Sequence, residues 1–374
     1  MIYADYAAAS PMTKRALDVF TETARSLYGN PSSLHQCGQD AHDAMEHARR
    51  QCADMIHAQP DEVVFTSGGT ESDNFALRGM HPERIITSAV EHPAVLRTAE
   101  DLARRGVRLT VLPVDEGGVV SLCALETALR DADGKILVSV MLANNETGVI
   151  QPAREIGRLA HAYGALFHCD AVQGAGHVPV DVSELGCDLM SVSAHKLGGP
   201  KGVGFLYVRR GVKLDPILTG GGQEHGLRSG TESVPLIAAF GAACEEASQT
   251  MDAESARLSG LRDRIETDLM KLDDVRRNGE GKRLPGILNL SFGGVGGEAL
   301  TLMCDLKGLA VSSGSACHAG DETPSHVLTA MNVPEKYRSS ALRISLGHGT
   351  SDADAEEITR IVTESVKLLR EMRS

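Results

Sequence analysis

Seven apolar stretches between about residue 60 and residue 210 constrain the fold of this chain more than any other feature. They read EVVFTS, RIITSA, VRLTVLPV, KILVSVMLA, ALFHCDA, DLMSVSAH and GVGFLYVRR, and segments of helical periodicity separate them. Stretches that are apolar throughout, rather than at every second residue, are typical of strands whose two faces are both covered. The sequence therefore predicts an α/β fold with a mostly parallel central sheet.

The pattern changes after this region. A glycine-rich stretch, TGGGQEHGLRSGT at 219–231, precedes a long helical pattern that begins near residue 232 and extends to about residue 272. Beyond it we expect two short strands, ILNLSF and ALRISLG, and a helix near 297–307. A closing amphipathic helix over 351–373 begins at a Ser-Asp pair, a common helix start. These elements predict a smaller α+β domain.

The chain length fits two domains of unequal size, because 374 residues exceed what one typical core supports. We place the large domain at residues 14–250 and the small domain at 1–13 plus 251–374. The opening stretch IYADYAAASP looks extended and too short to fold alone. We expect it to pack against one of the two domains.

Charge and hydropathy exclude several classes of partner. The formal net charge is -13, and the acidic residues are spread along the chain, which argues against direct contact with nucleic acid or an anionic membrane. The first residues lack the basic and apolar regions of a signal peptide, and no segment approaches the roughly 20 apolar residues that cross a bilayer. We expect a cytoplasmic protein.

The eight cysteines do not predict a metal site or a disulfide framework, because they form no CxxC pair and none has zinc-ligand spacing to a histidine pair. Most should be reduced and structural. Cys317 differs, because the stretch VSSGSACHAGDETPS at 311–325 offers no large apolar residue near it. A thiol on a loop that looks exposed requires an explanation.

A phosphate site is one interpretation of the stretch TSGGTESDNFALRG. Here a strand ends, two glycines form a turn, and Thr70 begins a helix whose backbone N–H groups could bind an anion. The alternative is a structural turn in which Thr70 caps the helix. The stretch matches neither a Walker A loop nor a GxGxxG dinucleotide turn.

Two further strand ends carry polar residues. Asp170 ends the strand in FHCDAVQG, and Lys196 follows the strand in SVSAHKLGGPKG. Taken singly, Asp170 could be a salt-bridged acid and Lys196 a lysine that extends toward solvent. Together with an anion site they supply what pyridoxal 5′-phosphate needs: a phosphate contact, an acid for the ring nitrogen and an amine that forms a Schiff base.

These motifs resemble those of the cysteine desulfurases, of the NifS and IscS type, in the class V aminotransferase group of fold-type I pyridoxal-phosphate enzymes. The resemblance extends from residue 3 to about residue 350 and implies a seven-stranded central sheet. It implies that Lys196 carries the cofactor covalently, that Asp170 pairs with the ring nitrogen and that His92 stacks on the ring. Asn145 and Gln173 would lie near the phenolic oxygen. The implied phosphate contacts are Gly69, Thr70, Ser193, His195 and, from the second subunit of a homodimer, Thr231.

The same resemblance implies a substrate site and a nucleophile. Arg343 in ALRISLG would bind the carboxylate of L-cysteine, since a guanidinium can donate two parallel hydrogen bonds, and Asn30 in YGNPSS would assist. Cys317 in the motif SSGSAC would take the sulfur as a persulfide, leaving L-alanine, and pass it to an acceptor protein. This motif marks the branch of the family with a long catalytic loop. His318 stands where a small hydroxyl residue is common.

Other functions remain open at this point. A selenocysteine lyase or a cysteine or cystine β-lyase would use the same fold and cofactor without a persulfide on the enzyme. A non-catalytic protein could instead use Cys317 to hold a metal or an iron–sulfur cluster on a partner. The pathway is equally open among iron–sulfur cluster assembly, tRNA thiolation and sulfur modification of DNA.

Overall fold

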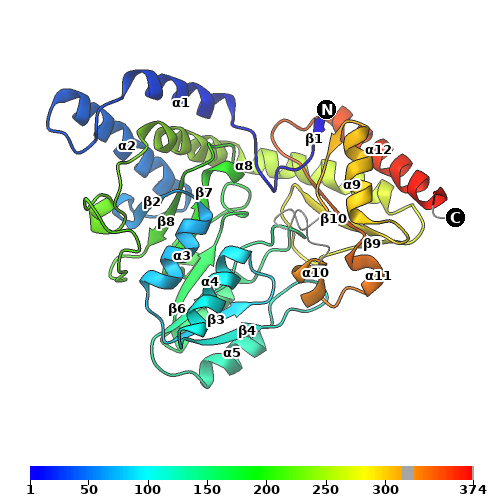
Figure 1. Cartoon of the computed structure of the whole chain (residues 1–374), viewed down its shortest axis with the longest axis horizontal. Helices are drawn as coiled ribbons and strands as arrows, with labels where there is room; N and C mark the ends of the chain where they lie inside the picture. The colour runs from blue at the N-terminus through cyan, green and yellow to red at the C-terminus, as the bar shows by residue number, and fades with distance from the viewer. Residues whose placement is uncertain (314–323, 373–374) are drawn as a thin grey trace.

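A computed structural model describes residues 1–313 and 324–372 of the chain (Figure 1). Its centre is a seven-stranded sheet in which only β8 runs against its neighbours, so the predicted mostly parallel sheet is confirmed. Each strand falls within one of the seven apolar stretches. In spatial order the strands are β2 (Val63–Thr66), β8 (Gly204–Val208), β7 (Leu189–Ser193), β6 (Leu166–Asp170), β5 (Ile136–Ser139), β3 (Arg84–Ser88) and β4 (Arg108–Leu112).

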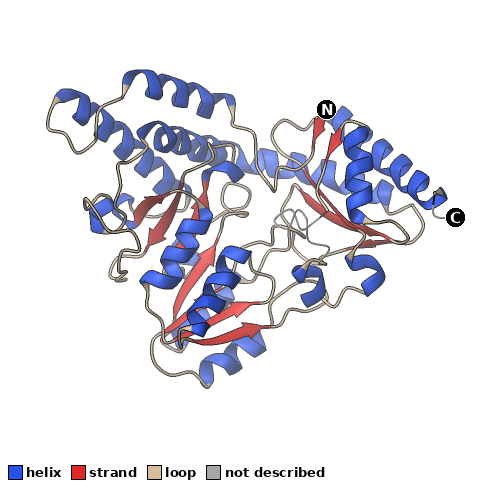
Figure 2. Cartoon of the chain, in the orientation of Figure 1, coloured by secondary structure: helices blue, strands red, loops and turns tan. Residues whose placement is uncertain are grey.

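Both faces of this sheet are covered by helices, which explains why its strands are apolar throughout (Figure 2). Val64 and Leu206 pack with Phe75 on one face, and Phe65 and Phe205 belong to a separate cluster on the other. The first face is covered by α3 (Gly69–Gly79) and α4 (Pro93–Arg104). The second is covered by α2 (Gln36–Met55), α6 (Ala153–Ala162) and α8 (Val234–Leu269), with α1 (Lys14–Ser26) outside them.

Helix α8 is a single helix of 36 residues that joins the two parts of the molecule (Figure 1). Near its start Phe240 stacks on Phe205 of the large sheet, with ring centroids 5.6 Å apart. Near its end Leu258 and Ile265 belong to a second hydrophobic core. The long helical pattern predicted after the glycine-rich stretch is therefore one unbroken helix.

The second core lies around two small sheets. One is antiparallel, in the order β12 (Ala341–Ser345), β10 (Ile287–Phe292) and β9 (Val275–Arg277), and the other pairs β1 (Ile2–Tyr3) with β11 (Leu309–Ala310). Helices α9 (Gly297–Leu306) and α12 (Asp352–Glu371) pack on them, and the Ser351 hydroxyl caps α12. These elements agree with the predicted strands and helices of this region. The predicted domain boundaries stay a prediction.

The remaining helices are short. They are α5 (Leu122–Arg130), α7 (Val182–Leu185), α10 (His326–Ala330), α11 (Glu335–Arg338) and the 3-10 turns η1 (Pro60–Glu62), η2 (Ala194–Lys196) and η3 (Glu224–Gly226). Within residues 1–313 and 324–372, no helix combines the length and the apolar character needed to cross a bilayer.

Candidate active site

A cavity of about 770 Å³ lies beyond the carboxyl ends of the parallel strands, where sheets of this type bind ligands. It brings together most of the residues singled out from the sequence. One of them, Arg343, comes from β12 of the second core, so the cavity is formed by both parts of the chain. The predicted residues that line it are Gly69, Thr70, His92, Asn145, Asp170, Gln173, His195, Lys196 and Arg343.

The predicted phosphate site is the turn between β2 and α3. Gly68 adopts a φ of 144°, which favours glycine, and it has no side chain to cap the helix. A Cβ atom on Gly69 would lie 2.8 Å from Val172 Cγ2, so the two segments approach closely there and a larger residue would have to displace that side chain. The first N–H groups of α3 therefore open onto the cavity as an anion site.

Ser193 and His195 lie beside this turn. The Ser193 hydroxyl is 2.8 Å from His195 Nδ1 and 3.6 Å from the position of a Cβ atom on Gly68. Burial lowers the pKa of His195 to about 4, so its ring is neutral at physiological pH. A neutral ring can still donate one hydrogen bond to a phosphate. Ser193 itself is buried behind the cavity wall rather than among the lining residues.

Asp170 ends β6 and is almost fully buried. Its Oδ1 accepts a hydrogen bond from the Val172 backbone, 2.9 Å away. Burial raises the pKa of Asp170, while the nearby His92 and Lys196 oppose that rise. A cationic ring nitrogen in the cavity would complete the pairing of this carboxylate, which is the contact that the sequence predicts for it.

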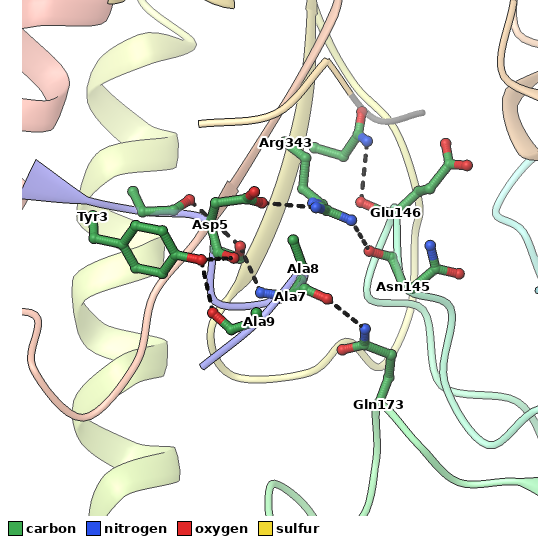
Figure 3. A network of polar contacts seen from close by, with 12 residues as sticks. Tyr3, Asp5, Ala7, Ala8, Ala9, Asn145, Glu146, Gln173 and Arg343 are labelled. Atoms are coloured by element: carbon green, nitrogen blue, oxygen red, sulfur yellow. Dashed lines mark hydrogen bonds and ion pairs between the residues drawn. The ribbon is translucent and has the colours of Figure 1, made fainter. Parts of the chain in front are cut away.

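Lys196 is at the end of the turn that follows β7, directly beyond the neighbouring strand end. Its amine donates to the carbonyl oxygens of Ala7 and Ala8, at 2.5 and 2.9 Å. Gln173 donates to the same Ala7 carbonyl, at 2.8 Å (Figure 3). The opening segment of the chain, expected to pack on one domain, therefore contacts both parts and closes one side of the cavity.

His92 is the N-cap of α4, and its Nδ1 accepts from the Ala94 backbone at 3.1 Å. Burial lowers the pKa of His92; the negative charge of Asp170 opposes this shift, and the positive charge of Lys196 adds to it. The lowered pKa favours the neutral imidazole, the form suited to stacking on an aromatic ring. The side chain therefore caps α4 and also lines the cavity, and its stacking on the cofactor ring stays a prediction.

Arg343 is 2% exposed and is held at both ends of its guanidinium (Figure 3). One terminal nitrogen donates to the Asn145 carbonyl at 2.9 Å, and the other to Asp5 Oδ1 at 2.7 Å. Beside it, Glu146 is buried and accepts a hydrogen bond from the Ser325 hydroxyl at 2.6 Å. Burial raises the pKa of Glu146 to about 7.

Sequence reasoning missed four acids at this site: Asp5, Asp73, Glu91 and Glu146. Asp73 lines the cavity, and burial raises its pKa well above the usual value, with Asp170 adding to the rise. Glu91 and Glu146 stand next to predicted site residues in the sequence, in EHP and NNE. An acid beside a strand end is a signal that could have identified them as candidate site residues. Asp5 had no such signal in the sequence.

Besides Ser193, three predicted residues are not among those that line the described cavity. Asn30 is exposed in the turn between α1 and α2, where its Oδ1 accepts from the Ser32 backbone at 2.9 Å. Thr231 is exposed beyond η3. Cys317 lies outside the described residues, as does His318. Next to that segment, Ser312 pairs with Arg343 through the backbone, so the chain leaves the described structure beside the cavity.

The residues present fit pyridoxal 5′-phosphate. A helix N-terminus for the phosphate, a buried acid for the ring nitrogen and an amine on the next strand end all face one cavity. By contrast, the residues that the structure describes contain no group of three or more histidine, cysteine, aspartate or glutamate side chains arranged to hold a metal ion.

Comparison with known proteins agrees with this site. The family model described as aminotransferase class-V matches residues 2–358. A protein of Methanosarcina thermophila named cysteine desulfurase IscS is 43% identical, over 99% of this chain and 93% of its own length. A solved NifS-like protein has a TM-score of 0.91 at 35% identity, covering 98% of this chain and 99% of that one. The structure titled SspA in complex with cysteine has a TM-score of 0.81 at 34% identity, covering 92% and 99%.

Fold and cavity together define a pyridoxal-phosphate-dependent enzyme of the class V aminotransferase type. Within that class, the chain belongs to the cysteine desulfurase family, because the matches extend over nearly its full length.

Proposed function

We propose that this protein removes sulfur from L-cysteine, giving L-alanine and a persulfide on Cys317. The observation that carries the proposal is the placement of Asp170 and Lys196 at adjacent strand ends, in one cavity with the buried Arg343. An acid and an amine at this spacing suit pyridoxal 5′-phosphate, and a buried guanidinium suits an amino-acid carboxylate.

Each residue then has a task. When bound, pyridoxal 5′-phosphate supplies a sink for the electrons released at the substrate Cα. Asp170 keeps the ring nitrogen protonated, and His92 packs against the ring face. Arg343 would hold the substrate carboxylate. Lys196, whose amine is free once the substrate amine has replaced it on the cofactor, would take the proton from the substrate Cα.

The sulfur leaves by attack of a thiolate. Cys317 sulfur bonds to the substrate sulfur while the Cβ–S bond breaks, and its electron pair stays on Cβ. Cβ takes up a proton and Cα regains the proton held by Lys196, which yields L-alanine and leaves the outer sulfur on Cys317. A thiolate of an acceptor protein attacks that sulfur and releases Cys317.

The assembly belongs to the same proposal. We propose a cytoplasmic homodimer in which Thr231 of one subunit contacts the phosphate bound by the other. The exposure of Thr231, outside its own cavity, supports this arrangement. Asn30, equally exposed, is proposed to assist substrate binding.

Replacing the proposed nucleophile tests the reaction. A Cys317→Ala variant should keep the absorbance of the bound cofactor yet produce no alanine from L-cysteine, with or without dithiothreitol. Turnover by this variant in the presence of dithiothreitol would indicate a β-lyase instead. Wild-type protein that is colourless and that borohydride leaves unchanged would indicate a non-catalytic protein.

A further inference from the structure

Arg343 is a buried cation that depends on few partners. Its side chain is 2% exposed, and a guanidinium has five N–H donors, of which two are used by Asn145 and Asp5. The buried Nε has no acceptor among the described residues. A buried donor without an acceptor is costly, so the remaining N–H groups favour an incoming carboxylate.

Asp5 is the only described side chain with an opposite charge that is paired with this guanidinium. Its carboxylate is 20% exposed and lies 2.7 Å from the terminal nitrogen of Arg343. The pair is therefore partly shielded from solvent, where a charge-assisted hydrogen bond is stronger than on an open surface.

The backbone around Asp5 is fixed from two sides (Figure 3). The Tyr3 hydroxyl donates to the carbonyls of Asp5 and Ala9, at 3.1 and 2.7 Å. Residues on both sides of Asp5 bond to Ser345 of β12: its backbone N–H donates to the Ala4 carbonyl at 2.8 Å, and its hydroxyl accepts from Ala7 at 2.9 Å. The carboxylate of Asp5 thus comes from a rigid turn rather than from a free terminus.

The same turn contacts the other cation of the site. Two residues beyond Asp5, the Ala7 carbonyl accepts from the Lys196 amine at 2.5 Å. One short segment therefore bonds both to the group that would bind the substrate carboxylate and to the lysine that would carry the cofactor. Its geometry sets where these two groups lie relative to each other.

We propose that Asp5 is a substrate-positioning residue: it orients the guanidinium of Arg343 so that the unused N–H groups receive the carboxylate of the amino acid. The proposal rests on the proposed function, in which Arg343 binds that carboxylate. Asp5 does not touch the substrate in this account. It acts through Arg343, and its effect should appear in substrate binding rather than in the chemical step.

Two variants of the loaded enzyme separate charge from hydrogen bonding. Asp5→Ala removes both, and we expect it to raise KM for L-cysteine about tenfold or more while kcat stays within about threefold. Asp5→Asn keeps an acceptor oxygen without the charge, and should restore part of the lost affinity. The matched control is Asp61→Asn, which breaks the exposed pair of Asp61 with Arg210, far from the cavity, and should leave KM unchanged.

A binding measurement gives a readout without turnover. L-alanine, the proposed product, has the same carboxylate, and its binding can be titrated through the cofactor absorbance. We expect its dissociation constant to rise in parallel with KM in both Asp5 variants. Thermal unfolding of each variant tests whether the fold is retained, and Asp5→Asn keeps the experiment informative where Asp5→Ala is unstable.

Two outcomes would overturn the inference. If KM and L-alanine affinity are unchanged in folded Asp5 variants, the Asp5 carboxylate has no role in substrate binding. If the variants bind L-alanine more tightly, the Asp5 carboxylate competes with the substrate carboxylate for Arg343, which is the opposite of the proposed role. Failure of the proposed function is distinguishable, because it would show in the wild-type protein as absence of alanine production from L-cysteine.

Discussion

At the scale of single residues, burial raises the pKa of several carboxyl groups in or beside the cavity. Glu91 is fully buried, and its Oε1 accepts from the Ser88 hydroxyl at 2.5 Å and from the Met141 backbone at 3.0 Å. Its second oxygen has no partner among the described residues. Burial raises the pKa of Glu91 to about 8, so the folded protein holds a proton there that the unfolded chain releases near pH 4.5.

Glu91 should therefore make stability depend on pH. Because the folded pKa lies above the unfolded one, its contribution is complete below about pH 4.5 and is lost as the pH rises toward 8. The expected slope is at most about 1.4 kcal/mol per pH unit. Glu91→Gln, which mimics the protonated form, should lose less stability between pH 5.5 and 7.5 in urea unfolding. An equal loss in variant and wild type would contradict the raised pKa.

The sequence predicted the residues of the site that follow strand ends, and missed those that reach it by long-range packing. Asp170 and Lys196 follow recognisable strands, so their place at one edge of the sheet could be inferred. Asp5 meets Arg343 only because β1 and β12 belong to the same part of the fold. No local sequence pattern predicts this contact, because 338 positions separate the two residues.

At the scale of elements, the glycine-rich stretch before α8 is fixed to the large sheet by a buried ion pair. Glu224 of η3 accepts from both terminal nitrogens of Arg49 on α2, each at 2.8 Å, and also from the Phe65 backbone of β2. Both charged side chains are 2% exposed. Glu224 and His225 have φ values of 51° and 58°, a strained conformation that these contacts maintain.

Breaking this pair should be strongly destabilising. Glu224→Gln would leave the buried guanidinium of Arg49 without its counter-ion, and we expect a loss of about 3–5 kcal/mol in the free energy of unfolding. Urea unfolding at neutral pH measures the loss. Asp18→Asn, which breaks the exposed pair with Lys14, is the control and should change stability little. A small loss in Glu224→Gln would show that the pair is not what holds η3.

Elements were predicted well where hydrophobic burial decides them. The seven strands of the large sheet were recognisable because helices cover both faces of the sheet, which makes the strands apolar throughout. Helix α8 was recognisable because its buried residues recur with helical periodicity. Strand β9 was missed. It has only three residues, VRR, and owes its conformation to pairing with β10 rather than to its own composition.

At the scale of the whole molecule, the proposed dimer makes each active site depend on two chains. Residues of one chain line the described cavity, and Thr231 of that chain is exposed outside it. Thr231→Ala should weaken cofactor binding about tenfold, through loss of one hydrogen bond to a charged group. Titration of the apoprotein, followed by cofactor absorbance, measures this change.

Mixed dimers test whether Thr231 acts across the interface. A dimer of one Thr231→Ala chain and one Lys196→Ala chain contains one site with an intact Lys196 and an intact Thr231 from the other chain. That site should regain wild-type cofactor affinity. If the mixed dimer binds the cofactor no better than the Thr231→Ala homodimer, the contact does not cross between subunits.

The central claim is that sulfur passes from L-cysteine to one thiol of this chain. Mass spectrometry of the loaded protein after incubation with L-cysteine, without reductant, tests that claim most directly. We predict one added sulfur atom on the peptide that contains Cys317, together with formation of L-alanine. Alanine production with no sulfur added to that peptide, or with sulfur on another cysteine, would contradict the account.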